Sequence, residues 1–268
     1  MKNEFMNYLL ENFNNLINNI KSLFIRLFTN YKIKLNSLLE KEDTFIISNG
    51  FCNCKDIKIF NIDFGKIKCK LCSVKRVIDF EKEEDIYFLL NNLKDKANFI
   101  IHTDGGTTRF ADFLPYIINQ RNIFLRSYIP EFALSAGSFI ALASNIICLN
   151  WYSCMGPVDT RLDYSISDDE EDIFSAKHIK LVKKKENAIT ELKALEAESF
   201  HNDDMFIINK IFKNKKKRDD ILKNFLNTNK SHYVKYGPKD LEKFGLKVKI
   251  GINKNIMEIF ELFKKLKN

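Results

Sequence analysis

Two short segments of the chain place glycine, serine and alanine where acyl-transfer chemistry could occur. Gly105-Gly106 and Ser135-Ala136-Gly137 each follow a run of apolar, strand-forming residues. At the carboxyl ends of neighbouring parallel strands both segments would face one crevice, where open α/β sheets bind their ligands. Ser135 would begin a helix, so the unbonded N–H of Ala136, together with that of Gly106, could hold a developing oxyanion. The alternative is a tight turn and a small-residue helix start that only permit close packing.

The elements around these two segments alternate between strand and helix patterns. This order predicts a parallel sheet with right-handed crossovers. Four of the nine glycines lie between residues 105 and 156, which marks backbone that needs special geometry. The strand patterns cover 98–103, 122–129 and 145–150, and the helical patterns cover 110–120 and 138–143.

The flanking segments are mostly helical in pattern. Apolar residues at helical spacing from Met6 to Phe28 predict a long amphipathic helix. Its polar face is mostly Asn, which favours packing on the body or on a second subunit over contact with a membrane surface. The remaining predicted elements are an edge strand at 76–80, helices at 82–92 and 175–198, a helical pair over about 203–226, an acidic loop at 163–172, and a closing short helix, strand and final helix from 238 onward.

The composition limits the class of protein. The 268 residues are 45% hydrophobic and 29% charged, which suits one globular domain with a short appendage and excludes a wholly disordered chain. No window approaches the roughly 18–20 apolar residues of a membrane span, and no secretory signal is recognisable. We therefore expect a cytoplasmic protein, with membrane association through the N-terminal helix as the alternative. The net charge of +8 is spread over Lys-rich helices without a nucleic-acid-binding motif, so no nucleic-acid partner is expected.

Residues 100–162 contain three ordered motifs, His102-Thr-Asp-Gly-Gly106, Ser135-Ala-Gly137 and Gly156-Pro-Val-Asp159. This segment resembles the serine dehydrogenase proteinase family of the ClpP/crotonase superfamily, and residues 237–248 are similar to the superfamily's closing helix and strand. The resemblance implies an α/β, ClpP/crotonase-like spiral of βαβ units behind an N-terminal amphipathic helix. It also implies a serine peptidase acting on peptides or proteins as a homo-oligomer, with Ser135 as nucleophile and Gly106 and Ala136 as the oxyanion hole.

The chain departs from the family pattern at three places in this segment. Asp104 stands where the family usually has Pro, Ser138 where it has Thr, and Thr160-Arg161 where it has Pro-Gln. These changes alter the crevice wall but keep the nucleophile and the glycines. His102, directly before the Gly-Gly turn, is expected to orient backbone rather than to transfer protons.

The general base has two candidates. No His lies about 25 residues after Ser135, where ClpP-type triads have one. The related signal peptide peptidase A and NfeD-type proteases use a Ser–Lys dyad, and Lys184, three residues before an Asn, has the NfeD-type spacing, with Lys183 one register away. A desolvated lysine can act as a base, although consecutive lysines are typical of a solvated face. His232 is the rival because it resembles a family His at the same place, and a structural hydrogen bond is its alternative role.

Four cysteines form a second constellation of potential ligands. Two close pairs could meet across a hairpin and hold a structural zinc ion, and free thiols are the alternative. We expect no cofactor for catalysis. The pairs are Cys52 with Cys54 and Cys69 with Cys72.

Three function classes follow from these patterns. The favoured one is a serine peptidase, and the alternative is a non-catalytic oligomeric peptide-binding scaffold on the same fold. Acyl-CoA chemistry is disfavoured because it does not need a nucleophilic Ser. The predicted organisation is an N-terminal amphipathic segment at 1–48, a Cys-bearing module at 49–73, a ClpP/crotonase-like domain at 74–252 and a C-terminal helix at 253–268.

Overall fold

The computed structural model describes most of the chain from residue 29 onward. The described residues are 19, 22–23, 26–27, 29–48, 58–59, 62–63, 76–79, 82–106, 108–167, 170–175, 188–226, 231 and 233–267. Most of the amphipathic helix predicted at 6–28 and all four zinc-ligand candidates lie outside these residues.

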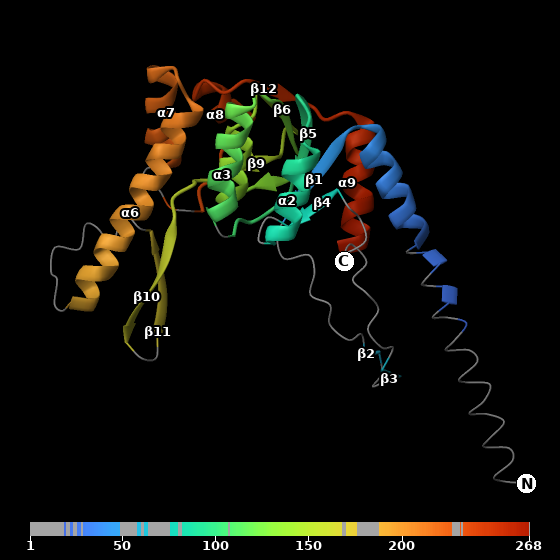
Figure 1. Cartoon of the computed structure of the whole chain (residues 1–268), viewed down its shortest axis with the longest axis horizontal. Coiled ribbons are helices and arrows are strands. Elements are labelled where there is room, and N and C mark those ends of the chain that lie inside the picture. The colour runs from blue at the N-terminus through green and yellow to red at the C-terminus, as the bar shows by residue number, and fades with distance from the viewer. Residues whose placement is uncertain are drawn as a thin grey trace, which may run out of the picture.

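A six-stranded parallel sheet forms the centre of the molecule (Figure 1). Its strand order is β12-β8-β6-β5-β1-β4, and every described pairing within it is parallel. The predicted α/β fold with a parallel sheet is therefore confirmed, including the edge position of β4. The strands are β1 Thr44–Ser48, β4 Val77–Asp79, β5 Lys96–Ile101, β6 Phe124–Ile129, β8 Ile146–Leu149 and β12 Val248–Ile250.

Helices cover both faces of this sheet, as parallel sheets require. On one face, α9 (Lys254–Lys267) and a helix at 29–41 pack together, and their buried residues form one cluster with the sheet. The other face buries the second and larger apolar cluster. The helices on that side are α2 Glu83–Asn92, α3 Thr108–Gln120, α4 Ala136–Leu142, α6 Ala188–Ile211, α7 Lys215–Phe225 and α8 Pro238–Lys243.

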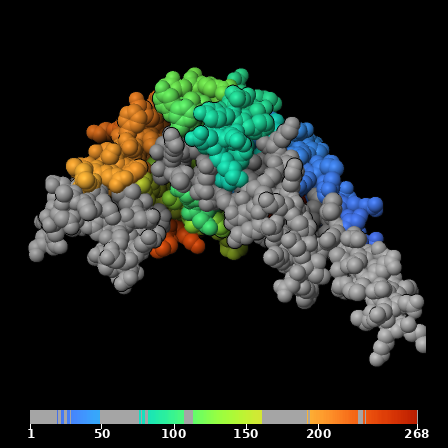
Figure 2. Space-filling model, turned by 60° about the horizontal axis from the view of Figure 1, so that its bottom comes forward, coloured from blue at the N-terminus to red at the C-terminus, as the bar shows by residue number. Residues whose placement is uncertain are grey.

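The space-filling view shows where these helices reach the surface. In Figure 2, α2 and α3 form adjoining parts of the surface, and α6 with α7 lies at the opposite end from helix 29–41. None of the helices within the described residues combines the length and the apolar character that a bilayer crossing needs.

Short strand pairs lie outside the main sheet. β7 (Phe132–Ala133) pairs in parallel with β9 (Cys154–Met155) directly beyond the ends of β6 and β8. β7 follows β6 and leads into α4, and β9 follows β8. The other pairs are the antiparallel β10 Arg161–Ser167 with β11 Glu170–Ser175, and β2 Lys58–Ile59 with β3 Ile62–Asp63.

Two expectations about the second half of the chain were wrong. In the acidic segment expected as a loop at 163–172, residues 163–167 and 170–172 lie instead in the paired strands β10 and β11, because apolar residues alternate with polar ones through β10. The break expected between the helix at 175–198 and the helical pair at 203–226 is absent, since α6 runs without interruption to Ile211. Asp204, which favours a helix end in isolation, is 2% exposed and accepts hydrogen bonds from the N–H and hydroxyl of Thr160 at 3.1 and 3.0 Å.

The N-terminal part also differs from expectation. The described helix continues through residue 41, past the predicted end at Phe28. β1 was not predicted as a strand, yet it lies inside the sheet between β4 and β5. The closing short helix, strand and final helix are confirmed as α8, β12 and α9. The limits of the four predicted segments stay predictions.

Candidate active site

Ser135 occupies a strained turn between β7 and α4. Its φ of +49° and ψ of −118° are unusual for a residue with a side chain. A sharp strand-to-helix turn of this kind projects the side chain out of the path of the chain. Serine at an N-cap commonly accepts a hydrogen bond from its own helix, but Ser135 makes no such bond within the described structure. Its hydroxyl is therefore not used to cap α4.

The loop after β5 passes directly against this serine. A Cβ added to Gly105 would lie 2.7 Å from Ser135 Cβ and 3.3 Å from Ser135 Oγ. Gly105 also has a φ of +124°, and the next residue, Gly106, has a φ of +147°. Both values favour glycine, and the contact leaves no room for a side chain at position 105. The two segments predicted to share a crevice are thus brought together.

Thr103 holds the glycine loop in place. Its side-chain oxygen accepts a hydrogen bond from Gly105 N–H and donates one to Gly105 O, both at 3.0 Å. Its carbonyl accepts a bond from Leu134 N–H at 3.0 Å, one residue before Ser135. Thr103 is 2% exposed, so these bonds are shielded from water. Its role was not predicted from the sequence, although it lies inside the His-Thr-Asp-Gly-Gly motif.

The start of α4 fits closely over the end of β5. A Cβ on Gly137 would overlap the Cγ2 of Thr103, so only glycine permits this approach. The N–H groups of Gly137 and Ser138 donate to the carbonyls of Leu134 and Ser135 at 2.9 and 2.8 Å. Within the described residues no such bond is formed by the N–H of Ala136, as expected for the first residue of a helix. That N–H lies beside Ser135 at the positive end of the helix dipole.

Ser138 fixes the loop that follows β9. Its hydroxyl donates to Ala133 O at 2.7 Å and accepts from Gly156 N–H at 3.0 Å. The position at which this chain has Ser where the resembled family has Thr is thus fully buried and hydrogen-bonded. The loop before Thr160 is also tied to α7, because Val158 N–H donates to Phe225 O at 3.1 Å.

The comparison with known proteins agrees with this geometry. A family model described as ClpP-like SDH-type serine proteinase matches residues 65–267. The chain belongs to this family. The predicted resemblance is confirmed, and the serine proteinase class holds at the level of the family.

Individual relatives match smaller parts or have low identity. Two uncharacterized proteins of Methanocaldococcus jannaschii are 33% identical over 91 residues and 34% identical over 65 residues, which cover 33% and 24% of this chain. The matches span 32% and 22% of those relatives' own lengths. One solved structure is a lysine-to-alanine variant of 1510-N, a membrane-bound stomatin-specific protease, in complex with a substrate peptide. It is 17% identical to this chain, with a TM-score of 0.45. The match covers 80% of this chain and 77% of the chain in that structure.

The structure does not place the predicted general bases or zinc ligands. Lys183, Lys184 and His232 lie outside the described residues, so the general base stays a prediction. The same holds for the four cysteines. Among the described residues, no group of three or more His, Cys, Asp or Glu side chains is arranged to hold a metal ion.

His102 packs against α9, whose buried residues belong to a different apolar cluster from those of α4. Its ring packs against Phe132 and against Phe260 of α9, with centroid distances of 4.5 and 5.1 Å. Its Nδ1 lies 3.7 Å from a carboxylate oxygen of Glu131, which also pairs with Lys264 of α9 at 2.6 Å. Burial lowers the pKa of His102, and Glu131 opposes only part of that effect. His102 therefore belongs to the packing of α9 on the sheet.

Replacing Gly105 tests the close approach to Ser135. In Gly105→Ala, the new methyl group clashes with Ser135 and the positive φ is strained, so we expect the free energy of unfolding to fall by about 3 kcal/mol. Gly251→Ala is the matched control, because Gly251 has a φ of +98° but no atom within 4 Å of an added Cβ. It should lose only about 1 kcal/mol. Urea unfolding of the two variants measures the difference, and equal losses would contradict the contact.

The environment of His102 predicts a dependence of stability on pH. Because its pKa is lowered from the usual 6.5 in the folded state, the unfolded chain binds the proton more readily. The stability that neutral His102 contributes is fully present above the pKa of the unfolded chain, and it is lost as the pH falls toward the lower pKa of the folded state. When the pH is lowered from about 7.5 to about 5.5, the free energy of unfolding should therefore fall less in His102→Phe than in the wild type. Identical pH dependences in urea unfolding would argue against this assignment.

Proposed function

We propose that the protein cleaves peptide bonds with Ser135 as the nucleophile and the N–H groups of Gly106 and Ala136 as the oxyanion hole. The observation that supports this most is the strained Ser135 at the start of α4, held against Gly105 with its hydroxyl unused as a cap. A purely structural N-cap serine gains nothing from this geometry, since its hydroxyl would normally bond to the helix.

The reaction follows from the chemistry of these groups. Ser135 Oγ attacks the peptide carbonyl carbon while a general base takes its proton, and the carbonyl oxygen becomes an oxyanion. Two N–H donors stabilise that charge in the transition state, and losing one such donor typically costs roughly 10²–10³ in rate. The C–N bond then breaks as the amine receives the proton, which leaves an acyl-serine. Water hydrolyses this ester by the same steps and restores the serine.

The base is proposed from the sequence. Lys184 is the first choice because of its spacing to Asn187, with Lys183 one register away, and His232 is the second. A lysine in this role must be desolvated so that its pKa falls.

The wider assignment includes peptide or protein substrates, a cytoplasmic location and a homo-oligomer. Exposed apolar side chains near the N-terminus support contact of this segment with a second subunit or a membrane surface. Leu23, Leu27 and Ile33 are 59%, 47% and 62% exposed. A structural zinc ion held by Cys52, Cys54, Cys69 and Cys72 stays a prediction, and no cofactor is assigned to catalysis.

Covalent labelling tests the nucleophile. A fluorophosphonate should add once to the wild type, as Ser135 Oγ attacks phosphorus and fluoride leaves, and intact-mass spectrometry detects the adduct. Ser135→Ala should give no adduct, whereas Ser231→Ala, which alters an exposed serine, should label like the wild type. A folded wild type that takes no label would instead support the non-catalytic peptide-binding scaffold.

Once the label is established, Lys183, Lys184 and His232 can be replaced one at a time, and the base is the residue whose loss slows labelling.

A further inference from the structure

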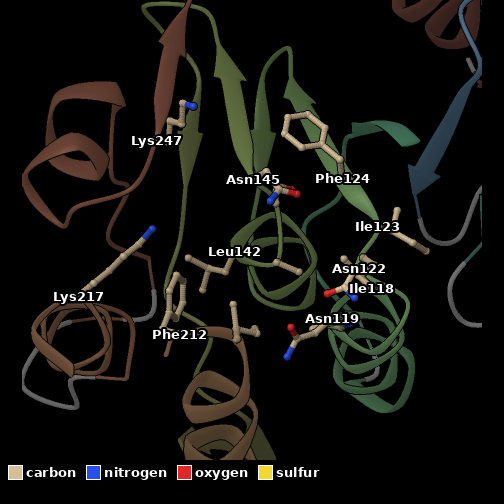
Figure 3. Close-up of a pocket in the computed structure, with 14 residues that line it drawn as sticks. Ile118, Asn119, Asn122, Ile123, Phe124, Leu142, Asn145, Phe212, Lys217 and Lys247 are labelled. Atoms are coloured by element: carbon tan, nitrogen blue, oxygen red, sulfur yellow. The ribbon is translucent and has the colours of Figure 1, made fainter. Parts of the chain in front are cut away.

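A cavity lies at the opposite end of α4 from Ser135. It has a volume of about 480 Å³ and is bounded by the carboxyl ends of α3, α4 and α6 (Figure 3). Ile123, Asn145 and Lys247, which precede β6, β8 and β12, also line it. These residues lie at the amino ends of the strands, so the cavity is on the sheet edge away from the proposed nucleophile.

Two lysines from different elements line this cavity. Lys217 comes from the first turn of α7 and Lys247 from the loop before β12 (Figure 3). Within the described part of the chain, neither ammonium group forms an ion pair, and no Asp or Glu is among the lining residues. Lys217 Nζ lies 5.0 Å from the ring centroid of Phe212, and burial lowers the pKa of this lysine. The cavity thus holds two cations without a carboxylate to neutralise them.

Part of the cavity wall is apolar and firmly held. Phe212, Ile118 and Leu142 are 6%, 4% and 1% exposed. On the neighbouring turn, Asn145 exchanges two hydrogen bonds with the backbone of Leu125, both at 2.8 Å. This turn is therefore fixed before any ligand arrives, and it offers the amide nitrogen of Asn145 as a further donor.

The charge balance selects the kind of anion that would bind. Three helices end at the cavity, and the partial negative charge at each carboxyl end disfavours a multiply charged anion such as phosphate. A carboxylate carries a single charge that a lysine ammonium group can pair with, and its alkyl chain can cover the apolar part of the wall. The volume falls within the roughly 300–1,000 Å³ of small-molecule sites.

We propose that this cavity is a binding site for a small alkyl carboxylate. The carboxylate lies between Lys217 and Lys247, and the alkyl chain packs on Ile118, Leu142 and Phe212. This site is independent of the proposed peptidase chemistry.

Calorimetric titration of the full chain with octanoate tests the proposal, with octanamide as the uncharged comparison. The wild type should bind octanoate saturably and octanamide at least about tenfold more weakly, because each charge-assisted hydrogen bond is lost. A Lys217→Met and Lys247→Met double variant keeps the side-chain stems but should lose about tenfold or more in octanoate affinity. Lys216→Met with Lys249→Met is the matched control, since both lysines are exposed neighbours outside the cavity, and it should bind like the wild type.

Three results would overturn the site. One is equal affinity for octanoate and octanamide, and another is unchanged octanoate binding by the Lys217 and Lys247 variant when its circular dichroism and melting temperature match those of the wild type. The third is binding of N-acetyl-Leu-Phe with a free carboxylate but not of octanoate, which would assign the cavity to a peptide terminus instead.

Discussion

The contact between the backbone of Gly105 and the side chain of Ser135 is the constraint on which the site depends. One more carbon atom at position 105 would lie 2.7 Å from Ser135 Cβ. Two chain segments about thirty residues apart must therefore meet with almost no free space between them, and different contacts hold each segment in place. Thr103 fixes the glycine loop through two hydrogen bonds, and Gly137 lets α4 descend onto the end of β5.

The rest of the fold supplies the rigidity that this contact needs. Strain at Ser135 of the order of 1–3 kcal/mol persists only where the surroundings enforce it. All seven residues of α4 are buried, and Ser138 joins the helix to both Ala133 and Gly156. The same short helix ends at the lysine-lined cavity, so the two candidate sites are at its two ends while the helix itself is locked in the core.

The centre of the sheet and the two halves of the site could be predicted because their signals are local. Strand and helix patterns alternate there, and the glycines and serine stand next to the turns that need them. β1 carries a local strand signal in the apolar run Thr44–Ser48, but its place inside the sheet depends on pairing with residues about fifty positions away. The helix break expected just before Asp204 is absent for a similar reason. Thr160, far away in the sequence, donates the hydrogen bonds that hold the Asp204 carboxylate inside the helix. The role of Thr103 depends on two bonds that form only once the loop is folded.

The measurement that tests this account most directly is the rate of fluorophosphonate labelling in variants of Thr103. Thr103→Val keeps the shape of the side chain but removes the hydroxyl that holds Gly105, and Thr103→Ser keeps the hydroxyl. Because small displacements of a catalytic group can cost roughly 100-fold in rate, the valine variant should label far more slowly than the serine variant while both stay folded. Equal labelling rates in the wild type and both variants would show that the braced glycine loop does not control the reactivity of Ser135.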